Sequence, residues 1–369
     1  MKRLTLGDVC KKASSNIAQK DLQDKIGAYP IYGASGLIKQ VDFYQQDKEY
    51  IAVVKDGAGI GRTMLLPAYS SVIGTMQYLL PKEGIPIDIK YLFYAVEHMN
   101  LAKYFSGATI PHIYFKDYQK EPINIPDIDT QRKISRIFDK IDALITSRKE
   151  QRTKLDQIVK SRFIEMFGEP ENNNKAWPVK SLDKLCTVGS SKRVYQSEQS
   201  SEGVPFWRIS DLVSKIDTGT VDSALFISEI KYTELKRAGL VPVTGDILVT
   251  SRGTLGRCYR IQDEDCFYFQ DGMISWLSNY SEEITPLYLQ YLFTMSGFRK
   301  QIDNTQAGST VAYLSIAMLK KLQVMVPDKA LQEQFAAFVA QTDKSKLAIQ
   351  KSLDKLEILK KALMQKYFG

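Results

Sequence analysis

The sequence is poor in the residues that most often build catalytic and metal centres. It contains two histidines, His98 and His112, and four cysteines without a Cys-x-x-Cys pair, which argues against a zinc site, a disulfide scaffold and histidine-based catalysis. It lacks the Asn-Pro-Pro-Tyr or Asp-Pro-Pro-Tyr motif of an amino-methyltransferase. Pro126-Asp127 could begin a nuclease motif, but the acidic-x-Lys strand of such a motif does not follow it. We therefore predict a non-catalytic protein without a metal site, rather than a fused methyltransferase or nuclease.

Long apolar runs are absent as well. No stretch of about 18 apolar residues exists to cross a membrane, and the first residues lack the apolar region of a signal peptide, so we expect a cytoplasmic protein without membrane contact. The composition, 44% hydrophobic and 25% charged, is that of an ordinary globular protein. A formal net charge of +8 and a pI near 9.0 favour an anionic partner such as nucleic acid, although many basic proteins have other partners.

The sequence does contain a long internal repeat. Three motifs recur at a constant displacement of 201 residues, namely Pro126-Asp127, Gln131 and Phe167-Gly168 as Pro327-Asp328, Gln332 and Phe368-Gly369. A constant displacement over about forty residues requires no gap, so each copy is predicted to be one uninterrupted element. The Pro-Asp turn can cap a helix, and a helix of about 38 residues would be roughly 57 Å long.

The apolar positions of both copies follow the heptad period of a coiled coil. The predicted seam consists of Ile134, Ile137, Ile141, Leu144, Leu155 and Ile158 in the first copy and of Phe335, Phe338, Ile349, Leu356, Leu359 and Leu363 in the second. It is polar at Arg148, Gln151, Thr342 and Ser345. Because neither helix is expected to be stable alone, we predict that the two pair with each other; a long core helix inside one larger domain is the alternative.

The segments before the two helices repeat a second plan. Residues 50–54 and 71–80 are predicted strands, and residues 89–104 a helix. The aligned segments are Tyr29–Leu37 with Val204–Leu212, Val53–Arg62 with Leu248–Arg257, Tyr91-Leu92-Phe93 with Tyr291-Leu292-Phe293, and Gly107 and Thr109 with Gly308 and Thr310. Cys10 and Cys186 also match, which predicts small core residues. The displacement grows along the alignment, so we expect about twenty extra residues between Val213 and Asp246.

These patterns predict an α+β fold with two small mixed α/β domains, each followed by a long helix. We expect a first domain at residues 1–125, a first long helix at 126–168, a linker at 169–176, a second domain at 177–326 and a second long helix at 327–369. The linker is polar and rich in helix-breaking residues.

A glycine-rich stretch, Gly57-Ala58-Gly59-Ile60-Gly61, follows a predicted strand and resembles a nucleotide-binding loop. Such a loop holds phosphate at the N-terminus of a following helix, but the next residues, 62–67, are extended and end at a proline. The glycine pattern is also largely lost in the matching residues 251–257. We therefore favour a β-turn whose tip contacts another molecule over a cofactor loop.

Basic and aromatic residues near the two turns are the candidate binding residues. Arginine can contact guanine edges and phosphates with two hydrogen bonds, which lysine does less specifically. Lys55 and Arg62 flank the first turn, and Arg252 and Arg257 flank the second. The further candidates are Lys39, His112, Tyr114 and Lys116 in the first domain and Lys192, Arg193, Trp207 and Arg208 in the second. Solvated surface charges, or buried arginines that end strands, are the alternatives.

Two threonines complete the candidate set. Thr109 and Thr310 follow matching glycines, and each can cap a following helix and direct its free N–H groups at a phosphate. Simple helix capping is the alternative interpretation.

Two differing globular domains, each followed by a similar long helix, resemble the specificity (S) subunits of type I restriction-modification systems. The resemblance is carried by Ile125-Pro126-Asp127, Gln131-Arg132-Lys133-Ile134 and Phe167-Gly168, by Val326-Pro327-Asp328, Gln332-Glu333-Gln334-Phe335 and Phe368-Gly369, and by the domain motifs Tyr29–Gly33, Val204-Pro205-Phe206, Asp211-Leu212 and Gly245–Leu248. It covers the whole chain. Each motif is weak alone, and the fixed displacement makes their combination specific.

The resemblance implies that each domain is a target-recognition domain that reads one half of a split site in double-stranded DNA. It also implies that the two helices pair as an antiparallel coiled coil, which sets the spacer between the half-sites and docks two methyltransferase subunits. Unequal domains imply an asymmetric site. Adenine methylation with S-adenosylmethionine would reside on the methyltransferase subunits, and ATP- and Mg-dependent cleavage on restriction subunits where the system has them, so no cofactor is expected on this chain.

Family domains diverge too much for contact residues to be transferred, so the candidate contacts rest on the residues alone. Arg62→Ala and Arg257→Ala should each affect one half-site, by about 1–3 kcal/mol if the arginine contacts a base with two hydrogen bonds. A coiled-coil scaffold whose globular domains bind proteins is the alternative function, and DNA affinity without salt dependence would favour it.

Overall fold

The structure is a computed structural model that describes residues 2–57, 59–107, 111–305 and 312–369. The chain divides into two compact units, which we call unit 1 (Met1–Gln151 with Ile349–Gly369) and unit 2 (Arg152–Ala348). Each unit contains one globular domain and a part of both long helices. The linear domain boundaries given above stay a prediction.

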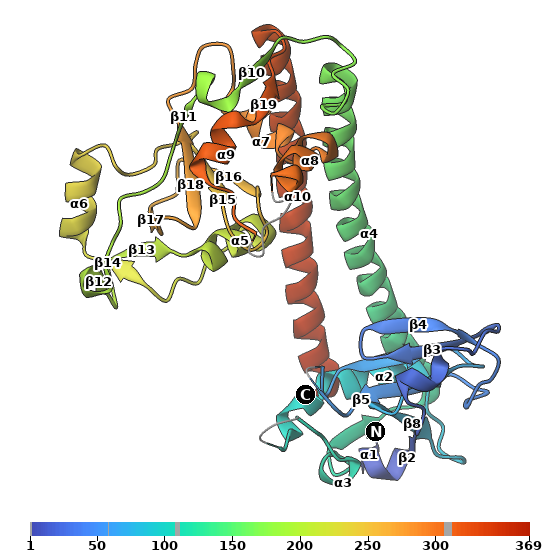
Figure 1. Ribbon diagram of the computed structural model, residues 1–369. Coiled ribbons are helices and arrows are strands. Elements are labelled where there is room, and N and C mark those ends of the chain that lie inside the picture. Colours follow the sequence, from blue (N-terminus) through green and yellow to red (C-terminus); the bar gives the residue numbers. More distant parts are fainter. Residues whose placement is uncertain (1, 58, 108–110, 306–311) are drawn as a thin grey trace. The chain divides into compact units, whose positions relative to one another are not determined.

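The described residues of unit 1 form three small sheets and short helices (Figure 1). Its elements are β1 (Lys2–Thr5), α1 (Leu6–Val9), β2 (Cys10–Ser14), a 3-10 helix (Gln19–Leu22), β3 (Tyr29–Gly33), β4 (Gly36–Val41), β5 (Tyr50–Val54), β6 (Thr63–Leu66), β7 (Ser71–Val72), β8 (Met76–Pro81), α2 (Ile89–His98), a 3-10 helix (Leu101–Tyr104), α3 (Phe115–Tyr118), β9 (Pro122–Ile125) and the first part of α4 (Ile128–Phe167). The main sheet has the antiparallel order β2-β8-β5-β6. A second sheet, β4-β3-β7, pairs β3 with β7 in parallel, and β1 pairs with β9.

Unit 2 repeats this plan with additions. Its elements are the last part of α4, β10 (Val179–Ser181), a 3-10 helix (Leu182–Lys184), β11 (Thr187–Gly189), a 3-10 helix (Gln196–Glu198), β12 (Gln199–Ser200), β13 (Val204–Trp207), α5 (Ile209–Thr218), β14 (Phe226–Ile227), α6 (Glu229–Arg237), β15 (Ile247–Thr250), β16 (Cys258–Arg260), β17 (Tyr268–Phe269), β18 (Ile274–Ser278), α7 (Pro286–Leu292), α8 (Ser296–Asn304), α9 (Ile316–Lys321), β19 (Gln323–Met325) and the first half of α10 (Lys329–Phe368). Its main sheet, β11-β18-β15-β16, matches that of unit 1 strand for strand, as does the pair β10-β19. The second sheet has the order β12-β14-β13-β17, with β13 and β17 parallel.

The predicted elements of unit 1 are confirmed in part. Residues 50–54 form β5 as predicted, but residues 71–80 form two strands in different sheets, because β7 pairs with β3 and β8 with β5. The chain turns between them, where the N–H of Met76 donates to the carbonyl of Ile73 (3.0 Å). The predicted helix over residues 89–104 ends at His98. Asn100 adopts a left-handed conformation (φ 49°), which stops the helix before the 3-10 turn that follows.

The predicted extra residues of the second domain form a separate layer. The end of α5, β14 and α6 fall between Val213 and Asp246, as the growing displacement predicted. A small cluster beneath α6 includes Phe206, Ile227 and Leu235. Cys10 and Cys186 are both buried core residues, as their matching positions predicted, and burial raises the pKa of each thiol to about 12.

One predicted alignment is wrong. Tyr91 matches Tyr288 rather than Tyr291, because each is the third residue after the capping residue of its helix, and each hydroxyl donates to a backbone carbonyl shortly before the long helix. The acceptors are the carbonyls of Asn124 (2.6 Å) and Met325 (3.1 Å). Unit 2 contains the pair Tyr-Leu twice, as Tyr288-Leu289 and Tyr291-Leu292. The predicted alignment used the second pair, because a phenylalanine follows it as it follows Tyr91-Leu92.

The repeated glutamines anchor the long helices. Gln131 is fully buried, donates to the carbonyls of Pro86 (3.1 Å) and Pro126 (2.9 Å), and accepts from the N–H of Asp88 (2.8 Å). Gln332 makes the same three contacts with Glu283, Pro327 and Thr285. Each amide therefore satisfies three backbone groups that would otherwise be buried without partners. This explains why the glutamine recurs at a fixed position.

In unit 1 the two helix segments run antiparallel and contact each other. The ring of Phe138 in α4 lies 5.7 Å from that of Phe368 in α10, and 4.9 Å from that of Tyr94 in α2. Lys360 in α10 pairs with Asp142 in α4 (2.9 Å) and with Glu97 (3.3 Å). The residue numbers of the paired positions run in opposite directions, which fixes the antiparallel sense within this unit.

Unit 2 shows the same sense. Phe163 and Phe167 in α4 pack their rings 5.5 and 5.4 Å from Phe335 in α10, and Lys346 pairs with Asp156 (2.6 Å). A continuous coiled coil over the full 40 residues of each helix stays a prediction.

The predicted seam is correct at some positions and wrong at others. Ile134, Ile141 and Phe335 are buried as predicted, and so is the polar Thr342. The side chains of Ile137, Leu144, Ile158 and Leu359, by contrast, are 36–49% exposed. Phe138, Val159, Phe163 and Leu353 are buried instead. The reason is that each long helix packs on the domain helix α2 or α7 as well as on its partner, which widens and rotates the buried face.

Candidate nucleic-acid interface

In unit 1 the predicted turn lies between β5 and β6. Its ends are closed by hydrogen bonds from Val54 N–H to the Arg62 carbonyl (2.9 Å) and from Gly61 N–H to the Val54 carbonyl (2.9 Å). Gly61 has a positive φ (78°), and a Cβ there would lie 2.3 Å from the backbone nitrogen of Ala102. Glycine is therefore required at this position by conformation and by space. The strand β6 that follows agrees with the prediction of a β-turn rather than a phosphate-binding loop; Ala58 lies outside the described residues.

Two further loops meet this turn. The guanidinium of Arg62 donates to the carbonyl of Ala34 in the β3–β4 turn (2.9 Å). The N–H of Gly57 donates to Pro111 (3.0 Å), and the N–H of Ile113 donates to Lys55 (3.0 Å). These bonds place three segments that are distant in the sequence against one another.

The side chains at this junction include most of the candidates predicted in the first domain. The Nδ1 atom of His112 contacts the carboxylate of Asp56, and the His112 ring lies 4.2 Å from that of Tyr114. Lys116 lies over the Tyr114 ring at 5.1 Å, and the amino group of Lys55 lies 3.5 Å from Asp56. Lys55, Arg62, His112, Tyr114 and Lys116 thus gather in one place.

Two candidates of the first domain lie elsewhere. The amino group of Lys39 donates to the carbonyls of Leu22 (2.8 Å) and Gln23 (3.2 Å), so it holds the end of a 3-10 helix. Its side chain is occupied by the fold of its own domain. Thr109 lies outside the described residues, as do Thr310 and its glycine, Gly308, in the second domain.

The turn between β15 and β16 in unit 2 has the same closure and one residue fewer. Thr250 N–H donates to Arg257 (2.9 Å), and Gly256 N–H donates to Thr250 (2.8 Å), which matches the bonds of Val54 and Gly61. Gly256 also has a positive φ (69°). Lys55 therefore matches Ser251, and Asp56 matches Arg252. The predicted alignment placed Arg257 correctly but missed this deletion inside the turn.

The two predicted arginines of this turn have different surroundings. Both terminal nitrogens of Arg257 donate to the carboxylate of Asp217 in α5, and this bond raises the pKa of the guanidinium and lowers that of the carboxyl. Arg252 is exposed, and its guanidinium lies over the ring of Tyr313 at 5.1 Å. Arg257 is thus held within unit 2, whereas Arg252 faces solvent.

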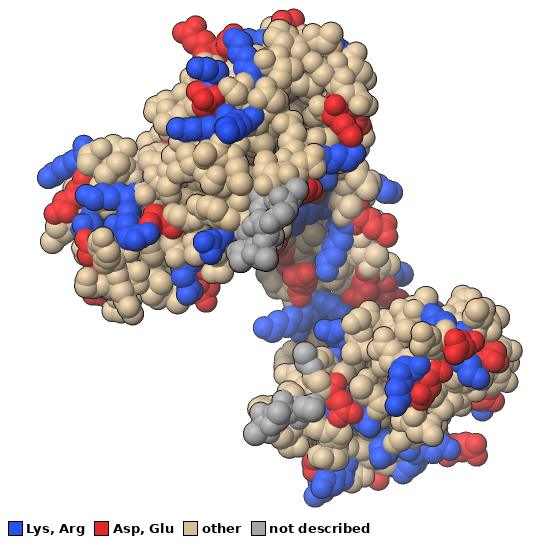
Figure 2. All heavy atoms as spheres, viewed as in Figure 1, with Lys and Arg blue, Asp and Glu red and all other residues tan. Residues whose placement is uncertain are grey.

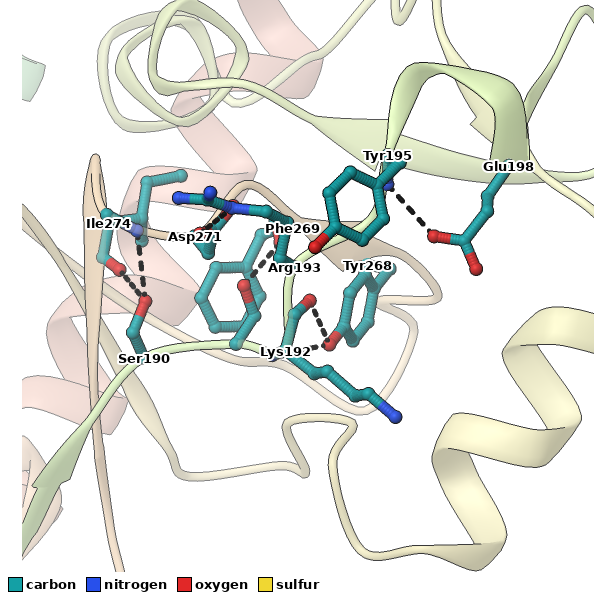
Figure 3. A network of polar contacts seen from close by, with 11 residues as sticks. Ser190, Lys192, Arg193, Tyr195, Glu198, Tyr268, Phe269, Asp271 and Ile274 are labelled. Atoms are coloured by element: carbon teal, nitrogen blue, oxygen red, sulfur yellow. Dashed lines mark hydrogen bonds and ion pairs between the residues drawn. The ribbon is translucent and has the colours of Figure 1, made fainter.

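A second basic segment of unit 2 runs beside β17 (Figure 3). Ser191 donates to Phe269 (2.7 Å), and the hydroxyl of Tyr268 accepts from the N–H of Lys192 (2.9 Å) and donates to its carbonyl (3.0 Å). These bonds fix the backbone, and in Figure 3 the amino group of Lys192 extends away from them. Arg193 pairs with Asp271 (2.8 Å), and its side chain stays 66% exposed.

Trp207 and Arg208 separate in role. Trp207 is 5% exposed and stacks on Phe267 with ring centres 3.5 Å apart, so the ring belongs to the core rather than to a contact surface. A ring buried in this way has almost no surface left for DNA, which disagrees with the predicted DNA contact of Trp207. Arg208 is exposed at the start of α5, where its backbone N–H donates to Asp211 (2.8 Å).

Sequence reasoning missed Asp56, Tyr313 and Asp217, which lie beside the candidate residues. The predicted contacts were chosen among basic residues and the aromatic residues near them, so neither aspartate was considered. Tyr313 lies 201 residues after His112, and the constant displacement of the nearby motifs was the signal that could have found it.

Charges of both signs lie on the face of the molecule that Figure 2 shows. On the face seen in Figure 2, Lys and Arg side chains are interspersed with Asp and Glu in each unit. Within the described ranges, no group of three or more His, Cys, Asp and Glu side chains is arranged to hold a metal ion. No described helix is both long and apolar enough to span a membrane.

The comparison with protein families decides the identity. The family model of the type I restriction modification DNA specificity domain matches residues 1–157 and 174–359, which is most of the chain and both globular domains. The chain belongs to this family of specificity subunits. The resemblance found in the sequence is thereby confirmed.

Curated relatives agree with this membership over most of their length. A Haemophilus influenzae protein assigned as a type I restriction enzyme specificity subunit is 24% identical over 366 residues, which covers 95% of this chain and 92% of that protein. The specificity subunit of the type I restriction enzyme MjaVIII from Methanocaldococcus jannaschii is 23% identical and covers 85% of this chain and 77% of its own.

Solved structures from type I restriction-modification systems share the fold. The S subunit of the type I restriction-modification system of M. genitalium superposes with a TM-score of 0.61 at 16% identity, covering 100% of this chain and 96% of that one. A chain from a structure that addresses assembly and conformational transition of the type I R-M system gives a TM-score of 0.50 at 14% identity, covering 100% and 97%. The mixed α/β architecture with two long helices is therefore that of a specificity subunit.

Proposed function

We propose that this specificity subunit recognises a bipartite, asymmetric DNA site, and that each globular domain reads one half of it. The observation that carries the proposal is the pair of turns, which share one backbone closure and differ in their exposed side chains. A shared closure supports a shared task, whereas different side chains support different half-sequences.

The position of the turns in their sheets supports contact with DNA. Each turn joins the edge strand of the main sheet, β6 or β16, to its neighbour, so it is the end of a two-stranded ribbon. A ribbon of this kind fits the major groove, where base edges can be distinguished by their donors and acceptors. The other cations of each unit would contact phosphates, which position the protein without reading sequence.

The paired helices would fix the spacer between the half-sites and dock two methyltransferase subunits. Several apolar side chains on their outer faces support docking, since they are large and 36–69% exposed. They are Ile137, Leu144, Ile358 and Leu359 in unit 1 and Ile158, Ile164 and Leu347 in unit 2. In unit 2 a shallow groove lined by Ile158, Arg162 and Phe338 accompanies them.

The chemistry of the system would reside on its partners. In this proposal, the methyltransferase subunits bind S-adenosylmethionine and methylate adenine, and restriction subunits, where the system has them, cleave with ATP and Mg. The specificity subunit itself supplies binding, spacing and orientation.

The test is to map adenine methylation across a genome in cells that express a candidate methyltransferase subunit with and without this chain. A split motif that depends on the chain would support the proposal and reveal both half-sites. A stable, active complex whose methylation shows no chain-dependent motif would contradict it, and would favour the scaffold that binds proteins. DNA affinity of the purified complex should also fall steeply with salt.

A further inference from the structure

Asp56 and Arg252 occupy the same position, the second residue of each turn, which we name the tip position. Each forms an isolated antiparallel bridge, Asp56 with His112 and Arg252 with Tyr313. The residue before each tip accepts the same backbone hydrogen bond, from Ile113 in unit 1 and from Leu314 in unit 2, both at 3.0 Å. One backbone position therefore carries an acceptor in one unit and a donor in the other.

The acceptor of unit 1 is already engaged by its own chain. The Asp56 carboxylate contacts His112 and lies 3.5 Å from the amino group of Lys55. A carboxylate held between two such groups has less capacity left for a base.

The donor of unit 2 is presented to solvent. Arg252 is exposed, and its guanidinium lies over the Tyr313 ring. Among residues 2–57, 59–107, 111–305 and 312–369, no carboxylate lies within ion-pair distance of it; Arg257 and Arg193, by contrast, are both paired with aspartates. An aromatic ring can restrict a guanidinium while leaving its edge N–H groups available.

We propose that Arg252 reads a guanine in the half-site of the second domain, and that the first domain reads its half-site without an arginine–guanine contact at the matching position. The inference rests on the proposed function. Guanine offers the O6 and N7 acceptors in the major groove, which match two N–H groups of arginine, and this pairing distinguishes guanine from the other bases. A phosphate contact would use the same charge but would carry no sequence information.

The experiment is to repeat the methylation map with Arg252→Ala and Arg252→Lys in the complex with the methyltransferase subunit. In both variants, one guanine position in one half-site should become degenerate, with the preference for guanine falling by about 5- to 150-fold. Lysine keeps the charge but lacks the planar fork, so it should not restore the preference. Arg237→Ala is the matched control, because that arginine is exposed at the end of α6 and is not among the candidate contact residues, and it should leave the motif unchanged.

The outcomes separate the inference from the proposed function. If the wild-type chain directs no split motif, the proposed function fails. If the motif appears and Arg252→Ala lowers methylation equally at all sites, Arg252 contacts a phosphate and the inference alone is overturned. An unchanged motif in a folded Arg252→Ala variant overturns it as well.

The reciprocal change tests the first domain. Asp56→Arg combined with His112→Tyr transfers the unit 2 pair to unit 1. The double variant should acquire a guanine preference at one position of the other half-site. A folded, active variant with the original motif would contradict the equivalence of the two tips on which the inference depends.

Discussion

The two recognition units keep the same internal anchors and change what their turns expose. Gln131 and Gln332 hold the long helices through the same three backbone contacts, and a glycine with positive φ closes each turn. The tip residue, by contrast, is an aspartate in one unit and an arginine in the other. Residues that satisfy buried backbone groups are thus retained, whereas the residue at the matching position of each turn is free to differ.

Arg62 and Arg257 follow the two turns at matching positions, but they have different partners. Arg62 donates to a backbone carbonyl at Ala34, whereas Arg257 pairs with the carboxylate of Asp217. Asp217 lies near the end of α5, and the matching part of unit 1 has no helix at this point. The added segment of unit 2 therefore gives an existing arginine a new partner.

The loss of stability on substitution is expected to differ most between the two units at Gly61 and Gly256, the glycines that close the turns. An added Cβ at Gly61 would lie 2.3 Å from the backbone of Ala102, whereas at Gly256 it would meet the flexible end of the Ile302 side chain at 2.5 Å. We expect Gly61→Ala to lower the free energy of unfolding by about 3 kcal/mol or more, and Gly256→Ala by about 1–2 kcal/mol. Urea denaturation of the full chain measures both.

Gly57→Ala separates conformation from crowding in that experiment. Gly57 has a φ of 87°, and a Cβ there would meet nothing within 4 Å. It should cost only the left-handed conformation, about 1–2 kcal/mol. Equal losses for Gly57→Ala and Gly61→Ala would show that the close approach of Ala102 does not contribute.

Substitution of the two anchoring glutamines, Gln131 and Gln332, should destabilise the protein by similar amounts. Gln131→Ala and Gln332→Ala each leave one buried N–H without its acceptor and two carbonyls without their donor. We therefore expect each substitution to lower the free energy of unfolding by about 2–3 kcal/mol. Thermal or urea unfolding gives the comparison. Gln341→Ala, at an exposed position of α10, should change stability by less than about 0.5 kcal/mol. Clearly unequal losses would mean that the helices are not anchored equivalently.

The repeat carried most of the fold prediction. Each long helix begins at the residue directly after its Pro-Asp pair and ends at the repeated phenylalanine, as the constant displacement predicted. The seam was less accurate, because heptad spacing considers one partner, while Phe138 and Phe163 pack on a domain helix as well. The spacing of apolar residues within one helix cannot predict where α2 or α7 packs against it, because that position is set by tertiary packing.

The candidate interface was predictable where residues are close in sequence to the turn. Lys55 and Arg62 were found in this way, but the contact of His112 with Asp56 joins positions 56 residues apart. Spacing and charge also could not distinguish the exposed Arg252 from the paired Arg257, because the partner Asp217 lies 40 residues earlier. Likewise, Trp207 is aromatic and next to an arginine in sequence, yet its ring is buried.

The smallest expected difference is the pH response of the two turn arginines. The hydrogen bond from Arg257 lowers the pKa of Asp217 in the folded chain, so folding favours its ionised form. The pair therefore contributes stability above the usual aspartate pKa near 3.9, and the contribution is lost as the pH falls through the lowered folded value. Because both groups lie at the surface, the effect is screened by solvent and small.

Melting temperatures measured from pH 7 downward test this response. Arg257→Ala should be slightly less stable than the wild-type chain at pH 7, and the two should converge below the lowered pKa of Asp217. Arg62→Ala provides the comparison, since its partner is a backbone carbonyl that does not titrate, so its difference from wild type should not depend on that carboxyl. The pairing of Arg257 with Asp217 would be refuted by an Arg257→Ala difference that stays constant through the acid range, or by an Asp217 pKa that is unchanged in that variant.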